Sequence, residues 1–166
     1  VRRPESAFDL MTRAAEGLQS SADQAGLRIV VEPCDAIVWV DSDRIIQTLV
    51  NLLSNAIKFS PRHSVITLSG SAGEAGFTFR VADRGRGVPG DKLETIFQRF
   101  QQVDASDSRD KGGTGLGLAI CQSIVTAHGG RIWAEPNPDG GAVFQLTIPS
   151  APAVPDAHAR EVAIKA

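Results

Sequence analysis

The sequence predicts one two-layer α/β sandwich, with a mixed, mostly antiparallel sheet and helices on one of its faces. Amphipathic helical patterns alternate with short runs rich in β-branched and aromatic residues. Two pairs of these runs flank turn-forming segments, which indicates hairpins and therefore antiparallel pairing. The chain has 166 residues, of which 42% are hydrophobic, so it is long enough to bury a core of its own.

Local signals mark the boundaries of several predicted helices, since the first stops at Gly26 and the last follows a glycine loop. The long central helix, for example, is capped by Asp41 or Ser42 and reaches about Phe59, before Ser60-Pro61. The last helix is apolar on most of its surface, which indicates that it is buried. The predicted helices span residues 8–25, 42–59, 91–100 and 116–128.

The predicted strands are short and follow the β-rich runs of the sequence. Gly73-Glu74-Ala75 and Asn137-Pro138-Asp139-Gly140 predict the two hairpin turns. The polar stretch 101–113 predicts a mobile surface loop. The strands are expected at residues 27–33, 37–40, 65–72, 76–83, 131–136 and 142–149.

Composition argues against several kinds of partner. The net charge is −2 and no basic run occurs, so nucleic acid is not expected to bind. No apolar stretch approaches the roughly 20 residues that cross a bilayer, so no direct membrane contact is expected. Cys34 and Cys121 lack metal or redox spacing and are expected to be buried, reduced thiols of a cytoplasmic protein. The folded domain is expected over residues 8–150, between a linker at 1–7 and a Pro/Ala-rich tail or linker at 151–166.

One face of the central helix carries Asn51, Asn55 and Lys58, opposite an arc of aliphatic residues. A solvated polar face is the plain interpretation. Asn is a poor residue for a helix interior, however, and two of them one turn apart suggest a function. Amide oxygens are suitable ligands for Mg²⁺, and a lysine nearly one turn further on suits a phosphate. The helix by itself leaves both interpretations open.

A first glycine loop, Asp83-Arg-Gly85-Arg-Gly87-Val-Pro89-Gly90, follows a predicted strand. Its glycines match a dinucleotide-binding fingerprint, but the βαβ unit of that fingerprint is missing. The loop is either an ordinary strand-to-helix turn or a base pocket. In a pocket, Asp83 would accept from an exocyclic amine such as that of adenine, and the glycines would let a flat ring approach the backbone. The Val-Pro pair would supply an apolar wall.

A second glycine loop, GGTGLG at 112–117, opens the last predicted helix. Glycines at a helix N-terminus expose backbone N–H groups, and the helix dipole favours negative charge there. The loop is therefore a phosphate cradle or, alternatively, a flexible hinge. Arg99, Arg109 and Lys111 in the preceding stretch are either solvated charges or phosphate ligands carried by a closing lid.

These motifs, in this order, resemble those of the ATP-binding catalytic domain of sensor histidine kinases. NLLSNAIKFS resembles the N box of that family, DRGRGVP its G1 box, IFQRF its F box and GGTGLGLAI its G2 box. VTAHGGRIWAE and GGAVFQLTIP are similar to its closing segments, so the resemblance covers residues 8–149. It implies a Bergerat-type α/β sandwich that binds ATP together with Mg²⁺.

The resemblance also implies roles for individual residues. Asn51 and Lys58 would act in catalysis within the metal and phosphate network, and Asn55 would ligate Mg²⁺. Asp83 would bind the adenine amine, and the phenylalanines of the F box would anchor the lid. The residues expected to bind the nucleotide are Asn55, Asp83, Gly85, Gly87, Phe97, Phe100, Arg109, Gly113, Gly115, Leu116 and Gly117.

The family transfers the γ-phosphate of ATP to a histidine on an upstream dimeric helical hairpin, and then to an aspartate of a response regulator. The acceptor histidine is usually followed by an acidic residue, which His63, His128 and His158 lack. The acceptor is therefore expected upstream of residue 1, and His128 is expected to be a structural cation at a helix end. We expect this domain alone to be a monomer, and its parent to be a homodimer that is cytoplasmic or anchored to a membrane.

Two alternative functions fit parts of the same pattern. ATP-hydrolysing proteins such as gyrase, Hsp90 and MutL resemble this domain, but they carry a glutamate base where Asn51 stands. An amide cannot deprotonate water, which disfavours fast hydrolysis. A non-catalytic nucleotide-sensing module would not need Asn55, Lys58 and both glycine loops together.

Overall fold

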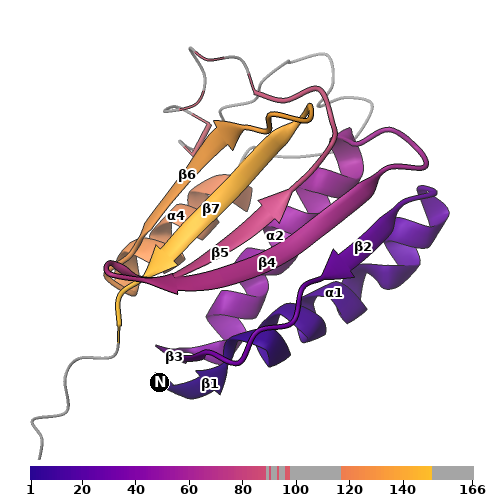
Figure 1. Ribbon diagram of the computed structural model, residues 1–166. Coiled ribbons are helices and arrows are strands. Elements are labelled where there is room, and N and C mark those ends of the chain that lie inside the picture. The colour runs from indigo at the N-terminus through magenta and orange to yellow at the C-terminus, as the bar shows by residue number, and fades with distance from the viewer. Residues whose placement is uncertain (89, 91–92, 94–95, 98–116, 151–166) are drawn as a thin grey trace, which may run out of the picture.

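The computed structural model describes residues 1–88, 90, 93, 96–97 and 117–150 of the chain. Within them, helices lie on one face of a five-stranded sheet, and a two-stranded ribbon lies near one end of the helical layer (Figure 1). The predicted fold class, a two-layer α/β sandwich, is confirmed. The elements are β1 (Arg3–Ser6), α1 (Ala7–Gln24), β2 (Arg28–Val31), β3 (Ile37–Val40), α2 (Ser42–Phe59), β4 (Val65–Gly73), β5 (Gly76–Ala82), α4 (Gly117–Ala127), β6 (Arg131–Pro136) and β7 (Ala142–Ile148).

The sheet has the strand order β2-β4-β5-β7-β6. β2 runs parallel to β4, and all other neighbours in the sheet are antiparallel. Both predicted hairpins are confirmed, with Gly73 opposite Gly76 in the first and Pro136 opposite Ala142 in the second. This order places the C-terminal end of β5 next to the turn between β6 and β7.

Side chains from both layers form one core. α1 and α2 pack against each other and against β4, while α4 packs against α2, β6 and β7. In β5, Phe77, Phe79 and Val81 are buried and alternate with less buried residues, as expected of a strand with one covered face. Asp41, one of the two predicted caps, is the N-cap of α2, and its side chain accepts the N–H of Arg44 at 3.4 Å.

The N-terminal segment, for which the sequence suggested a linker, contains a strand. β1 pairs antiparallel with β3, with Ser6 opposite Ile37. Val38 and Val40 of β3 are buried, whereas Ile37 and Trp39 are 67% and 36% exposed. The pairing gives RPES an extended conformation that its own composition does not predict.

Two burial predictions were wrong. The apolar composition of α4 predicted a helix buried on most of its surface, but Ile120 is 40% exposed and its buried residues fall on one side. The reason is the place of α4 in the layer, since it rests on β6 and β7 and meets α2 (Figure 1). Cys34 is half-buried because it lies in the connection between β2 and β3, whereas Cys121 is buried as predicted.

The predicted helix over 91–100 and the predicted loop over 101–113 fall almost wholly outside the described residues. In the part of the chain that the structure does describe, each helix is too short or too polar to cross a bilayer.

Candidate nucleotide-binding site

A pocket lies where β5 ends, beside the C-terminal half of α2 and the turn that joins β6 to β7. It brings together three segments that the sequence analysis singled out: the asparagine helix, the first glycine loop and the start of α4. The described residues that line the pocket are Asn55, Phe59, Asp83, Arg86, Gly87, Val88, Ile96, Leu118, Ala142 and Phe144.

Asp83 is fixed in the pocket wall by its own hydrogen bonds. Its Oδ1 accepts the N–H of Gly85 at 2.9 Å and the N–H of Ala142 at 3.1 Å. Its carbonyl oxygen accepts from Nδ2 of Asn137 at 2.9 Å. The residue is 5% exposed, and this burial raises the pKa of its carboxyl, while the two backbone N–H groups lower it. Because both carboxylate bonds use Oδ1, Oδ2 is the atom suited to accept from a ligand.

Glycines let the pocket loops lie against neighbouring backbone. A Cβ atom on Gly85 would stand 2.5 Å from the carbonyl oxygen of Phe59, and one on Gly141 would overlap the carbonyl oxygen of Asp83. Gly87 and Gly141 also have φ angles of +76° and +93°, which favour glycine. Gly87 lines the pocket, Gly85 donates its N–H to Asp83 in the pocket wall, and Gly141 packs against the backbone of the same residue.

The three polar residues predicted on α2 are all half-buried, but their surroundings differ. Asn55 lines the pocket. Asn51 lies one turn earlier, and its Nδ2 donates to the carbonyl oxygen of Gly117 over a long 3.5 Å. Neither Asn51 nor Lys58 is among the described residues that line the pocket. Of the three predicted residues, Asn55 is the one that lines it.

Cys121 lies at the same contact between α2 and α4. Its Sγ donates to the carbonyl oxygen of Thr48 at 3.7 Å. Burial raises the pKa of the thiol to about 12, and hydrogen bonding from Asn51 lowers it less. The thiol therefore stays protonated at neutral pH, and Cys121 packs the two helices together.

Apolar residues cover another side of the pocket. The ring of Phe97 is 3% exposed and meets the ring of Phe144 edge-on, with centroids 6.1 Å apart. Phe97 is therefore anchored in the core, beside a residue that lines the pocket.

Gly117 is the first residue of α4. The other predicted nucleotide-binding residues, which lie outside the described residues, are Phe100, Arg109, Gly113, Gly115 and Leu116.

Comparison with known proteins agrees with this geometry. The family described as histidine kinase-, DNA gyrase B- and HSP90-like ATPase matches residues 40–152. The chain belongs to this family. Asp83, Asn55 and the first glycine loop are thus parts of an ATPase-type nucleotide-binding domain.

The curated relatives of this ATPase domain are sensor histidine kinases. It is 42% identical over 117 residues to the sensor histidine kinase WalK of Bacillus subtilis, which covers 69% of this chain and 19% of WalK. It is 40% identical over 121 residues to the adaptive-response sensory kinase SasA of Nostoc sp., which covers 72% of this chain and 29% of SasA. The chain therefore spans less than a third of either relative.

Solved structures show the same fold. The catalytic domain of the histidine kinase ThkA matches with a TM-score of 0.78 and 27% identity, over 90% of this chain and 96% of that one. Full-length ShkA in complex with AMPPNP matches with a TM-score of 0.77 and 31% identity, over 92% of this chain and 32% of ShkA. The Bergerat-type sandwich expected from the motifs is confirmed.

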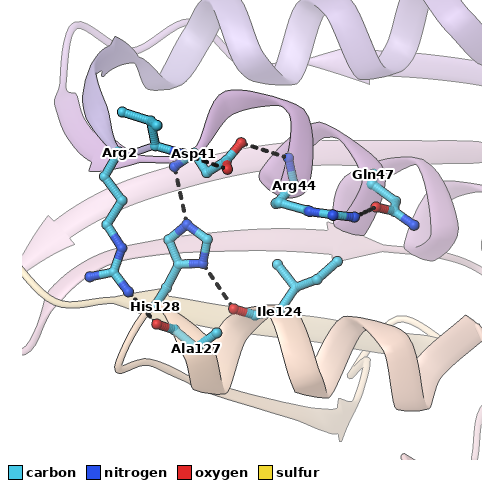
Figure 2. A network of polar contacts seen from close by, with 8 residues as sticks. Arg2, Asp41, Arg44, Gln47, Ile124, Ala127 and His128 are labelled. Carbon is cyan, nitrogen blue, oxygen red and sulfur yellow. Dashed lines mark hydrogen bonds and ion pairs between the residues drawn. The ribbon is translucent and has the colours of Figure 1, made fainter.

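His128 lies outside the pocket of this ATPase domain and holds two helices together (Figure 2). Its Nδ1 donates to the carbonyl oxygen of Ile124 at 2.8 Å, and its Nε2 accepts the N–H of Asp41 at 3.1 Å. Arg2 donates to the carbonyl oxygen of Ala127 beside it. Because Nε2 accepts a hydrogen bond, His128 does not act as the expected cation, but its expected structural role is confirmed.

Several residues of the site were missed in the sequence. Phe59 and Arg86 line the pocket, and Cζ of Arg86 lies over the Phe59 ring, 4.7 Å from its centroid. Asn137 was predicted only as part of a hairpin turn and Gly141 only as part of the segment GGAVFQLTIP, yet both contact the Asp83 backbone. The glycine pair before β7 was the available signal for that contact. No sequence signal indicated the contact between Arg86 and Phe59, because that contact depends on how α2 packs against the loop after β5.

Proposed function

We propose that this chain is an ATP–Mg²⁺-binding catalytic domain that donates the γ-phosphate of ATP to a histidine on an upstream dimerisation domain. The observation that carries the proposal is the placement of Asp83 and Asn55 in one pocket. The named relatives support it, since they are sensor histidine kinases. Because the chain spans a minor part of those relatives, the acceptor histidine is expected in the rest of the parent protein.

The base end of the pocket is suited to adenine. Asp83 offers Oδ2 to the exocyclic amine of the base, because Oδ1 is already held by two backbone N–H groups. A guanine base has a carbonyl oxygen at that position, which would face the carboxylate with no proton between them. Gly85 and Gly87 keep the loop backbone close, so a flat ring meets peptide groups there.

The metal end of the pocket fits Mg²⁺ in its donor chemistry. Asn55 presents a neutral, hard amide at the pocket wall, and Mg²⁺ takes its remaining ligands from phosphates and waters. The described residues contain no group of three His, Cys, Asp or Glu side chains that would hold a metal without a nucleotide. Bound there, Mg²⁺ would neutralise charge on the phosphate oxygens. Lys58 is proposed to add positive charge near them.

The proposed reaction is phosphoryl transfer to a nitrogen of the acceptor histidine. That nitrogen forms a bond to the γ-phosphorus, the bond from this phosphorus to the β,γ-bridging oxygen breaks, and ADP leaves. The phosphohistidine would then pass its phosphoryl group to a response regulator. This chain holds the nucleotide in position, which supplies much of the rate enhancement in such transfers.

Hydrolysis is disfavoured by the group at position 51. Asn51 is an amide, so it cannot act as a general base toward water. Its Nδ2 donates to the carbonyl oxygen of Gly117, which gives it a part in joining α2 to α4. The pocket therefore favours transfer to a nucleophile that the partner domain supplies.

The deciding experiment joins this chain to the upstream segment of its parent and adds ATP labelled at the γ-phosphate. The expected result is an acid-labile label on the upstream segment that depends on Mg²⁺. ATP hydrolysis at the rate of a dedicated ATPase, with no labelled protein, would favour the hydrolytic alternative. Lack of ATP binding by calorimetry would reject both catalytic functions.

A further inference from the structure

Arg86 and Phe59 form a stacked pair in the wall of the nucleotide pocket. Cζ of the Arg86 guanidinium lies 4.7 Å from the centroid of the Phe59 ring, and both residues line the pocket. Phe59 is the last residue of α2, and Arg86 lies in the loop after β5. An arginine over an aromatic ring is attracted by the ring electrons and remains able to stack on a second aromatic system.

The loop on both sides of Arg86 is fixed by close backbone packing. Gly85 donates its N–H to Asp83, and a Cβ on Gly85 would stand 2.5 Å from the carbonyl oxygen of Phe59. Gly87 has a φ of +76°, and a Cβ there would stand 3.1 Å from the carbonyl oxygen of Gly141. The backbone of Arg86 is therefore held against the end of α2, and its guanidinium lies over the Phe59 ring.

We propose that Arg86 is a base-stacking residue that makes one wall of the adenine pocket, with its guanidinium held between Phe59 and the purine ring. The inference rests on the proposed nucleotide binding and adds a residue to it. Apolar side chains, among them Val88 and Phe144, line the same pocket. The faces of the adenine ring would thus contact a cation and apolar side chains, while Asp83 would accept a hydrogen bond from the amine at the edge of the ring.

Contact with the base is favoured over contact with phosphate by the neighbours of Arg86. It shares the pocket wall with Asp83, Gly87 and Val88, which belong to the proposed base end. The ring of Phe59 also attracts the guanidinium, which favours a position over that ring. A stacked arginine contributes to binding of the nucleoside, whereas a phosphate ligand contributes to binding of the nucleotide alone.

The test compares Arg86→Gln with Arg84→Gln in the same loop. Arg84 is half-exposed and pairs with Asp139 at 3.8 Å, and it is not among the described residues that line the pocket. Each variant removes one positive charge from the same loop, so their general electrostatic effects are matched. Affinity for ATP–Mg²⁺ is measured by calorimetry and affinity for adenosine by NMR titration. Thermal unfolding checks that both variants fold.

We expect Arg86→Gln to lower the affinities for adenosine and for ATP by the same factor, about fivefold or more. Arg84→Gln should change either affinity by less than about twofold. Phe59→Leu should give a smaller loss for both ligands, since it frees the guanidinium from its support. A loss for ATP without a loss for adenosine would assign Arg86 to phosphate and overturn the inference, as would equal behaviour of the two arginine variants. If the unmodified chain bound no ATP, the proposed function itself would fail.

Discussion

Nε2 of His128 accepts the backbone N–H of Asp41 at 3.1 Å, which joins the end of α4 to the N-cap of α2 (Figure 2). α2 carries Asn55 and α4 begins at the other end of the helical layer, near the pocket. One neutral ring thus fixes the spacing of the two helices whose opposite ends form the site. His128 is 7% exposed, so no water replaces this bond without movement of the helices.

His128→Ala is expected to lower the free energy of unfolding by about 2 kcal/mol. The variant leaves the Asp41 N–H without its acceptor and opens a small cavity, and each change carries a cost. Gln122→Ala is the control, since Gln122 is exposed on α4 and its expected change is below about 0.5 kcal/mol. Urea unfolding of both variants measures the difference, and equal stabilities would show that the His128 bond contributes nothing.

Asp83→Asn is expected to stabilise the nucleotide-free chain at pH 7 and to weaken ATP binding. Burial raises the pKa of Asp83 in the folded state above its ordinary value of 3.8, so the folded chain binds the proton more tightly than the unfolded chain. The stability that comes from this tighter proton binding is fully present below pH 3.8, and it is lost as the pH rises through the pKa of Asp83 in the folded state. Asn keeps an oxygen for the two N–H groups and carries no charge.

The stability gain of Asp83→Asn should therefore shrink as the pH falls toward 3.8, which thermal unfolding at several pH values measures. ATP affinity at pH 7 should fall about tenfold or more, because an acceptor for the adenine amine is replaced by a donor. A gain that grows toward acid pH would contradict the burial argument. Equal affinity of the unmodified chain for ATP and GTP would contradict the role of Asp83 in base recognition.

Much of the fold was predictable because periodicity and capping report on local structure. α2 begins after Asp41 and ends before Ser60, as its cap and the following proline indicated. β1 was not predictable, since it owes its conformation to pairing with β3 across the length of α1. The exposed side of α4 was missed because composition gives the polarity of a helix and not its place in a layer.

In the candidate site, too, residues with a local sequence signal were predictable and residues that depend on long-range contacts were not. Asp83 and Gly87, which line the pocket, could be named in advance, because glycine spacing after a strand has a local cause. Arg86 could not, since an arginine next to glycines gives no sign of the ring that it will cover. Residues that act within their own loop could be predicted from the sequence. Contacts between segments far apart in the sequence became known only from the structure.

Asn55→Ala is expected to remove the Mg²⁺-dependent part of ATP binding and to abolish phosphotransfer to the upstream segment. Asn55 lines the pocket, and its amide oxygen is the proposed ligand of the metal. Affinity for ATP in Mg²⁺ should fall about tenfold or more, while affinity in excess EDTA should stay close to that of the unmodified chain. Gln47→Ala, on the same helix and away from the pocket lining, should alter neither value. Unchanged transfer by Asn55→Ala would exclude Asn55 as the ligand.

Gly141→Ala is expected to damage both stability and ATP binding, in contrast to Gly140→Ala next to it. Both glycines have positive φ angles, +93° for Gly141 and +100° for Gly140, so an alanine at either costs about 1 kcal/mol in backbone energy. A Cβ on Gly140 meets no atom within 4 Å, whereas one on Gly141 would overlap the carbonyl oxygen of Asp83. Relief of that overlap moves Asp83 away from the N–H groups that orient its carboxylate.

Gly141→Ala should therefore lose about 2 kcal/mol or more of unfolding free energy, and the difference between the two variants isolates the overlap. Its ATP affinity should fall by a factor near that of Asp83→Asn, because the same carboxylate is misplaced. Urea unfolding and calorimetry on the two alanine variants measure both effects. Equal losses would mean that the turn between β6 and β7 gives way without moving Asp83, and the close packing at Gly141 would then have no part in orienting the carboxylate that we propose to bind adenine.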